Sequence, residues 1–308
     1  PDILIGDVWY LLGSTLLTSE WAFNKKDEKA ERPATMPLVR EFRRRTKASS
    51  FPTPRKRLFE TGGGKYRTSW ATADYSKEES GVTMFAYEFA RSLDRQGIPQ
   101  GFVTMSSGHA GRSRQLASPL SWTSFHGVST VKDAAFKDRL NELFLQFPNT
   151  KVARKAATRH VEEVKAFVQS VIDTAESGAD LSEVALQAPA FPEAGKGGAV
   201  PSDTIPTYAY NWCVSPLTPM GVAGVIWVPS EANIGEDPSH YAAEMEVFAR
   251  SLPGTFAQES VQFLYAQPAT SLVEGITAPG IPGAKRTTFD QWPKSLEDIA
   301  IELAKLAE

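Results

Sequence analysis

The chain has 308 residues, of which 42% are hydrophobic and 10% aromatic, and its formal net charge is -3. This composition can bury one substantial core, so we expect residues 1–308 to form a single domain. The weak negative charge gives no general attraction to nucleic acid or to anionic membranes. No apolar run approaches the roughly 20 residues that cross a bilayer, so no membrane span is expected.

Short apolar runs bounded by turn residues predict strands buried on both faces, over residues 2–12, 101–105, 222–228 and 261–266. Apolar residues at helical spacing predict helices over residues 82–93, 161–175, 241–252 and 296–306. This alternation predicts an α/β fold with a doubly wound, mainly parallel sheet flanked by helices, a flavodoxin-like three-layer sandwich. Sites in such folds form beyond the carboxyl ends of the strands.

Two segments are irregular. Residues 40–57 carry eight Arg or Lys residues, which we interpret as a solvated loop, with an anion-binding surface as the alternative. Aromatic residues are not interleaved there at a stacking spacing, so nucleic acid is not expected as a partner. Residues 177–207 contain four prolines and are expected to form an irregular surface excursion. Because the chain opens on Pro1 rather than Met and a predicted strand begins at once, we expect a longer or processed precursor, with any signal peptide outside this sequence.

Cysteine and histidine usage argues against metal or disulfide chemistry. The one cysteine, Cys213, cannot form an internal disulfide, and we expect it in the core, where free cysteines are usually buried. The four histidines lack the spacing of a metal motif. We therefore predict neither a metal nor a cofactor. We expect His126, His160 and His240 to be surface or helix-capping residues.

Four blocks of residues follow one another in a recognisable order. The first is Gly6-Asp7-Val8-Trp9, followed by Gly13-Ser14-Thr15-Leu16-Leu17. The second runs from Phe89-Ala90-Arg91-Ser92-Leu93 through Ser106-Ser107-Gly108-His109-Ala110-Gly111 to Trp122-Thr123-Ser124. The third is Gly224-Val225-Ile226-Trp227-Val228-Pro229-Ser230-Glu231-Ala232-Asn233, and the fourth is Phe289-Asp290-Gln291-Trp292-Pro293-Lys294.

These blocks resemble those of the sialate O-acetylesterases and related carbohydrate acetylesterases, members of the SGNH (GDSL-like) hydrolase superfamily. The resemblance covers residues 2–306 and implies an SGNH-hydrolase-like fold and an extracytoplasmic location, periplasmic or secreted. It also implies a site in which serine, histidine and an acid hydrolyse acetylated sugars.

The sequence departs from the family at those reactive positions. The resemblance places the nucleophile at Thr15, the histidine at Trp292 and the acid at Phe289. An indole cannot accept a proton near neutral pH, and the β-branch of threonine restricts its side-chain rotation. Asn233 remains where the family has an asparagine that donates to the oxyanion. The other cleft candidates are Gly13, Ser107, Gly108, Gly111, Ser230, Glu231 and Asp290.

Three functional hypotheses follow. The first is a catalytically silent domain retained as a binding or assembly module, with carbohydrate as the ligand class. The second is an active carbohydrate O-acetylesterase with a rebuilt site, in which Ser14 or Thr15 is the nucleophile, His109 the base and Asn233 the oxyanion donor. The third is a structural subunit of a larger assembly.

Overall fold

The structure is a computed structural model. It describes residues 5–18, 34–45, 69–74, 81–93, 95, 97–106, 118–131, 134, 137–138, 140–141, 151–182, 189, 206–207, 209–234, 238–292 and 296–308. The statements below concern these residues.

A seven-stranded sheet forms the centre of the protein, with the strand order β3-β2-β4-β1-β5-β6-β7. Every neighbouring pair is parallel except β2 and β3, which are antiparallel. The strands are β1 (Asp7–Gly13), β2 (Met36–Arg45), β3 (Ser69–Ala73), β4 (Gln100–Ser106), β5 (Gly224–Val228), β6 (Gln262–Pro268) and β7 (Lys285–Phe289). The predicted α/β fold with a mainly parallel sheet is confirmed.

The central strands are buried on both faces because alternate side chains enter two separate cores. In β1, Trp9 and Leu11 belong to one hydrophobic cluster, whereas Tyr10 and Leu12 belong to the other. All five residues of β5 are buried. Continuous apolar runs of this kind are expected for parallel strands covered on both sides.

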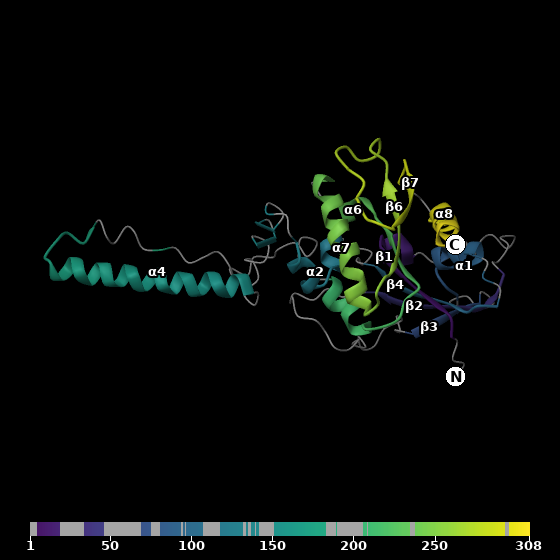
Figure 1. Cartoon of the computed structure of the whole chain (residues 1–308), viewed down its shortest axis with the longest axis horizontal. Helices are drawn as coiled ribbons and strands as arrows, with labels where there is room; N and C mark the ends of the chain where they lie inside the picture. The colour runs from purple at the N-terminus through teal and green to yellow at the C-terminus, as the bar shows by residue number, and fades with distance from the viewer. Residues whose placement is uncertain are drawn as a thin grey trace, which may run out of the picture.

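Helices cover the two faces (Figure 1). On the first face, α1 (Met84–Leu93) and α8 (Glu297–Ala307) pack together and contribute Phe89 and Leu303 to the cluster of Trp9. On the second face, α7 (Tyr241–Phe256) contributes Phe248 to the cluster of Tyr10. Shorter elements are η1 (Thr15–Thr18), η2 (Pro119–Trp122), α2 (Phe125–Ser129), the π-helical turn η4 (Tyr210–Val214), η5 (Ser215–Leu217), α6 (Glu231–Ile234) and η6 (Pro238–His240).

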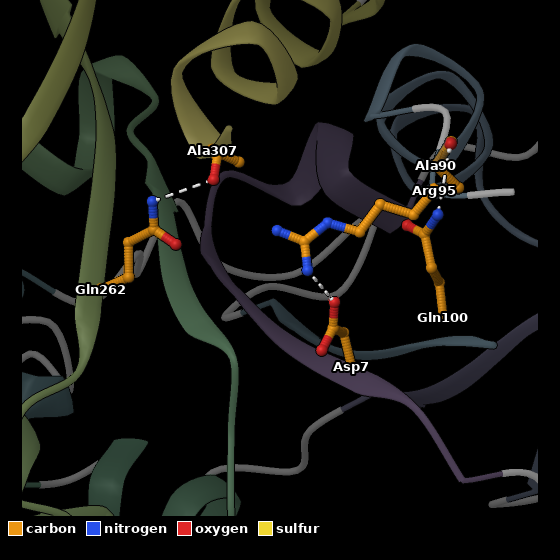
Figure 2. A network of polar contacts seen from close by, with 6 residues as sticks. All are labelled: Asp7, Ala90, Arg95, Gln100, Gln262 and Ala307. Carbon is orange, nitrogen blue, oxygen red and sulfur yellow. Dashed lines mark hydrogen bonds and ion pairs between the residues drawn. The ribbon is translucent and has the colours of Figure 1, made fainter. Parts of the chain in front are cut away.

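Side chains at the start of three strands tie the sheet to the ends of the helices (Figure 2). Gln100 donates through Nε2 to the carbonyl oxygen of Ala90 at 3.4 Å, and Gln262 donates to that of Ala307 at 3.3 Å. These carbonyls lie in the last turns of α1 and α8, where intrahelical partners run out. Asp7 of β1 forms an ion pair with Arg95. The amino edge of the sheet is therefore used for structural contacts.

Helix α4 (Lys151–Glu176) departs from the layered arrangement. The sequence predicted a helix over residues 161–175, and this helix is present, but Figure 1 shows it extending away from the sheet. Val161, Val168 and Ile172 are 49%, 48% and 43% exposed. The apolar residues of this helix thus do not serve as a cover for the sheet.

The basic segment differs from its interpretation as a loop. Residues 40–45 belong to β2, which lies between β3 and β4 in the sheet, and residues 46–57 fall outside the described part of the chain. Glu41, in the middle of this basic strand, is fully buried and accepts hydrogen bonds from the backbone N and the Oγ1 of Thr83 at 2.6 and 2.8 Å. Burial of Cys213, at 1% exposure, confirms its predicted place in the core.

Candidate functional site

β1 and β5 are neighbours in the sheet, and their carboxyl ends lie side by side. At this point the helices that connect successive strands switch from one face of the sheet to the other. The chain passes from β1 toward β2 and β4 with α1 on the first face, and from β5 to β6 through α7 on the second face. Gly13, the last residue of β1, pairs with Val228, the last residue of β5. In doubly wound sheets, such a switch point is where ligands bind.

The turn after β1 requires glycine. Gly13 has φ +117°, and a Cβ atom there would lie 2.3 Å from the carbonyl oxygen of Val228. The next backbone N–H, that of Ser14, donates to this same oxygen at 2.7 Å. A residue with a side chain would therefore push the turn away from β5 as well as strain its backbone. Gly13 acts by shaping the backbone.

Ser14 and Thr15 follow this turn. Ser14 is 1% exposed, and its Oγ accepts a hydrogen bond from the backbone N–H of Leu16 at 3.1 Å. This contact holds the first residues of η1, which begins at Thr15. The hydroxyl of Ser14 is thus buried in a local turn. The side chain of Thr15 is outside what the structure describes.

The turn after β5 is organised by Asn233. This residue is fully buried on α6, and its Oδ1 accepts hydrogen bonds from the backbone N and the Oγ of Ser230, both at 2.8 Å. The carbonyl end of the Asn233 side chain therefore holds the backbone of this turn, and Nδ2 is its donor end. Glu231, at the start of α6, is exposed.

The segment after β7 carries Trp292 where the family resemblance places a histidine. The indole is partly buried, packs against the cluster that contains Trp227 and Tyr265, and lies 5.5 Å from the ring of Phe289 at 59°. Asp290 is exposed. Since β7 pairs in parallel with β6, this segment lies at the same edge of the sheet as Gly13 and Asn233. The segments that follow β1, β5 and β7 therefore lie along one edge of the sheet, with β5 and β6 between β1 and β7.

Ser107, Gly108, His109 and Gly111 lie outside the described residues. Of the remaining histidines, His126 is exposed on α2 and His240 is the residue before α7. His160 corrects one expectation, because it is 7% exposed on α4 and is therefore a buried residue. Within the described part of the chain, no three His, Cys, Asp or Glu residues are grouped so as to hold a metal ion.

Gln267 is a polar residue at this edge that the sequence patterns did not identify. It lies near the end of β6, is 5% exposed, and pairs with Thr288 of β7. Its Nε2 donates to the carbonyl oxygen of Pro268 at 3.2 Å, while its Oε1 has no hydrogen-bond partner among the described residues. The available signal was a glutamine at the end of the apolar run Phe263-Leu264-Tyr265-Ala266. A buried acceptor without a partner invites a ligand donor or an ordered water.

Comparison with solved structures shows a likeness in fold. A carbohydrate acetylesterase from Xanthomonas citri aligns with 99% of this chain at a TM-score of 0.58 and 18% sequence identity. The chain spans little more than half of that protein, 56% of its length. The likeness shows the shared α/β esterase-like fold.

A second solved structure, a protein from Arabidopsis thaliana, aligns with 98% of this chain and 98% of its own length, at a TM-score of 0.42 and 10% identity. No protein-family model matches the chain, and no curated protein matches it. None of the helices in the described ranges is both long and apolar enough to cross a membrane.

Proposed function

We propose that this chain is a catalytically silent SGNH-hydrolase-like domain that binds carbohydrate at the carboxyl edge of its sheet. The observation that carries the proposal is the packing of Trp292 together with the burial of Ser14. Trp292, where the family has its histidine, is packed against a hydrophobic cluster and the ring of Phe289. Ser14, the alternative nucleophile, is buried and accepts a backbone hydrogen bond.

Hydrolysis by the family mechanism needs a hydroxyl within reach of both a base and a substrate carbonyl. The Trp292 indole nitrogen only donates, so it cannot deprotonate a hydroxyl. A Ser14 hydroxyl that is 1% exposed cannot approach an ester without rearrangement of η1. Loss of nucleophile or base costs serine hydrolases on the order of 10^6-fold in kcat.

Binding of a sugar draws on Trp292 and Gln267 at the same edge of the sheet. The partly exposed indole of Trp292 offers an apolar face for a sugar ring. The buried Oε1 of Gln267 offers an acceptor for a sugar hydroxyl. Ligand pockets combine apolar surface with a few such polar groups. The carbohydrate acetylesterase that shares this fold is consistent with a sugar as the ligand class.

Two measurements on the purified chain test the proposal. We expect no release of acetate from p-nitrophenyl acetate or acetylated sugars above the rate without protein, and no effect of Ser14→Ala or Thr15→Ala. We also expect at least one acetylated or free glycan to bind in a glycan array and in calorimetry, with the affinity reduced about tenfold or more by Trp292→Ala. Trp70→Ala is the control, because Trp70 is 53% exposed on β3 at the opposite end of the sheet order.

The rebuilt esterase is the alternative that these measurements distinguish. Hydrolysis that disappears in both His109→Ala and either Ser14→Ala or Thr15→Ala would overturn the silent domain and establish an active site. Absence of both hydrolysis and glycan binding would instead favour a structural subunit. Binding that Trp292→Ala leaves unchanged would show that the sugar site lies elsewhere.

A further inference from the structure

Helix α4 presents a continuous seam of exposed residues. Positions 158, 161, 165, 168, 172 and 175 alternate in steps of three and four, and all six are exposed. The three largest apolar residues among them, Val161, Val168 and Ile172, are 49%, 48% and 43% exposed. Steps of three and four place residues on one side of a helix, which is the pattern of a helix–helix contact. We call these six residues the exposed seam.

The partner for this seam does not come from the described core. Figure 1 shows α4 extending away from the sheet and from helices α1, α7 and α8. Exposed apolar side chains scattered singly are ordinary on protein surfaces. Here, however, three of them share one side of a single helix that stands apart from the hydrophobic clusters on both sheet faces.

The charges of α4 are opposite to those that stabilise an isolated helix. Arg154 and Lys155 lie near its start, whereas Asp173 and Glu176 lie near its end. Its first turn has no acidic residue and its last turn no basic residue. The helix dipole disfavours this arrangement, because the amino end is partly positive and the carboxyl end partly negative.

Charged side chains in the middle of α4 form ion pairs with each other, whereas the described ones near its two ends do not. Arg159 pairs with Glu163 at 3.4 Å, and Lys165 pairs with Glu162 at 2.9 Å. Arg154, Lys155 and Glu176 form no ion pair with another described residue. The helix therefore has a basic end and an acidic end available to a partner of complementary charge.

We propose that α4 pairs in antiparallel orientation with α4 of a second copy of this chain. In the register that brings the two exposed seams together, Val161 lies opposite Ile172 of the second copy, and Thr158 lies opposite Ala175. Lys155 then lies beside Glu176 of the second copy, and the two-fold axis repeats this pair at the other end. A parallel pair would instead place the two basic ends together, so the charges select the antiparallel orientation.

Solution mass over a range of concentrations tests the pairing. The mass of the purified chain is expected to rise with concentration from 33.7 kDa toward twice that value. Ile172→Glu is expected to weaken the association about tenfold or more. Ser170→Glu is the control, because Ser170 is exposed on the side of α4 opposite the seam. Equal masses for wild type and Ile172→Glu at every concentration would overturn the proposal.

Charge reversal tests the interhelical pair of Lys155 and Glu176. Lys155→Glu and Glu176→Lys are each expected to weaken the association, because each brings like charges together at both ends of the pair. The double variant restores opposite charges and is expected to associate as the wild type does. Failure of the double variant to recover would rule out this register.

Cross-linking tests the orientation. Thr158→Cys combined with Ala175→Cys is expected to give a disulfide-linked dimer, whereas Thr158→Cys alone is expected to remain uncross-linked. The two positions are about 26 Å apart along one helix, so they cannot join within a chain. Cross-linking by Thr158→Cys alone would indicate a parallel pair and overturn the proposal. These results are independent of sugar binding, because none of the substituted residues lies at the sheet edge of Trp292.

Discussion

Glu88 is a buried carboxylate on α1, the helix that packs against α8. It is 2% exposed and lies in an ion pair with Arg91, whose side chain is 55% exposed. Burial raises the pKa of Glu88 above its ordinary value; Arg91 lowers that pKa, and Glu297 at the start of α8 raises it further. A raised pKa in the folded state means that the fold binds the proton of Glu88 more tightly than the unfolded chain does.

The pH dependence of the free energy of unfolding tests this reading of Glu88. Protonated Glu88 contributes stability below its unfolded pKa, and this contribution is lost as pH rises through the raised folded pKa. The glutamine side chain of a Glu88→Gln variant cannot lose a proton. We therefore expect the free energy of unfolding of this variant, taken relative to that of the wild type, to increase as pH rises from about 4 to about 7. Denaturant titration at both pH values measures the difference. Glu302→Gln on α8, an exposed carboxylate paired with Lys305, is the control. An unchanged or opposite difference would contradict the prediction.

At the scale of elements, one side-chain hydrogen bond joins the sheet to α7. Trp227, in β5, donates through Nε1 to the hydroxyl oxygen of Tyr241 at 2.9 Å, and both residues are almost wholly buried. Burial raises the pKa of the Tyr241 hydroxyl, so it stays neutral. Because β5 leads into the turn of Asn233 and Tyr241 begins α7, this bond fixes the helix to the strand that carries the candidate site.

Tyr241→Phe removes the acceptor and leaves the Trp227 N–H buried without it. We expect a loss of about 1–3 kcal/mol in the free energy of unfolding, measured by denaturant titration. Tyr265→Phe in the same hydrophobic cluster is the control, since no hydrogen bond of its hydroxyl to a described residue is found. A loss no larger than that of Tyr265→Phe would show that the bond contributes little.

At the scale of the whole molecule, α7 is part of the core and α4 is not. Proline inside a helix costs about 3 kcal/mol of helix stability. We expect Ala249→Pro in α7 to lower the melting temperature strongly, because α7 covers one face of the sheet. Ala166→Pro in α4 is expected to reduce the far-ultraviolet helical signal but to leave the melting of the sheet unchanged, measured at low concentration to limit self-association. A large loss of core stability in Ala166→Pro would contradict this separation.

The predictable parts of the fold were the strands and helices with a strong apolar pattern. β1, β4, β5 and β6 were predicted because both of their faces are buried, which gives continuous apolar runs. β2, β3 and β7 were not predicted. β7 exposes three of its five residues, Lys285, Arg286 and Thr288, and β2 carries the sequence Arg43-Arg44-Arg45 shortly after the buried Glu41. Strands with polar or charged residues resemble loops when only their own residues are considered.

The sequence by itself determined the α/β class and the presence of four of the parallel strands, β1, β4, β5 and β6, and it places a tryptophan at position 292. These depend on local patterns and on the order of the blocks along the chain. Only the tertiary structure decided that Ser14 is buried, that Oε1 of Gln267 has no hydrogen-bond partner among the described residues, and that α4 stands apart from the sheet. Each depends on which segments far apart in the chain come into contact, and residue patterns along one segment do not specify those contacts.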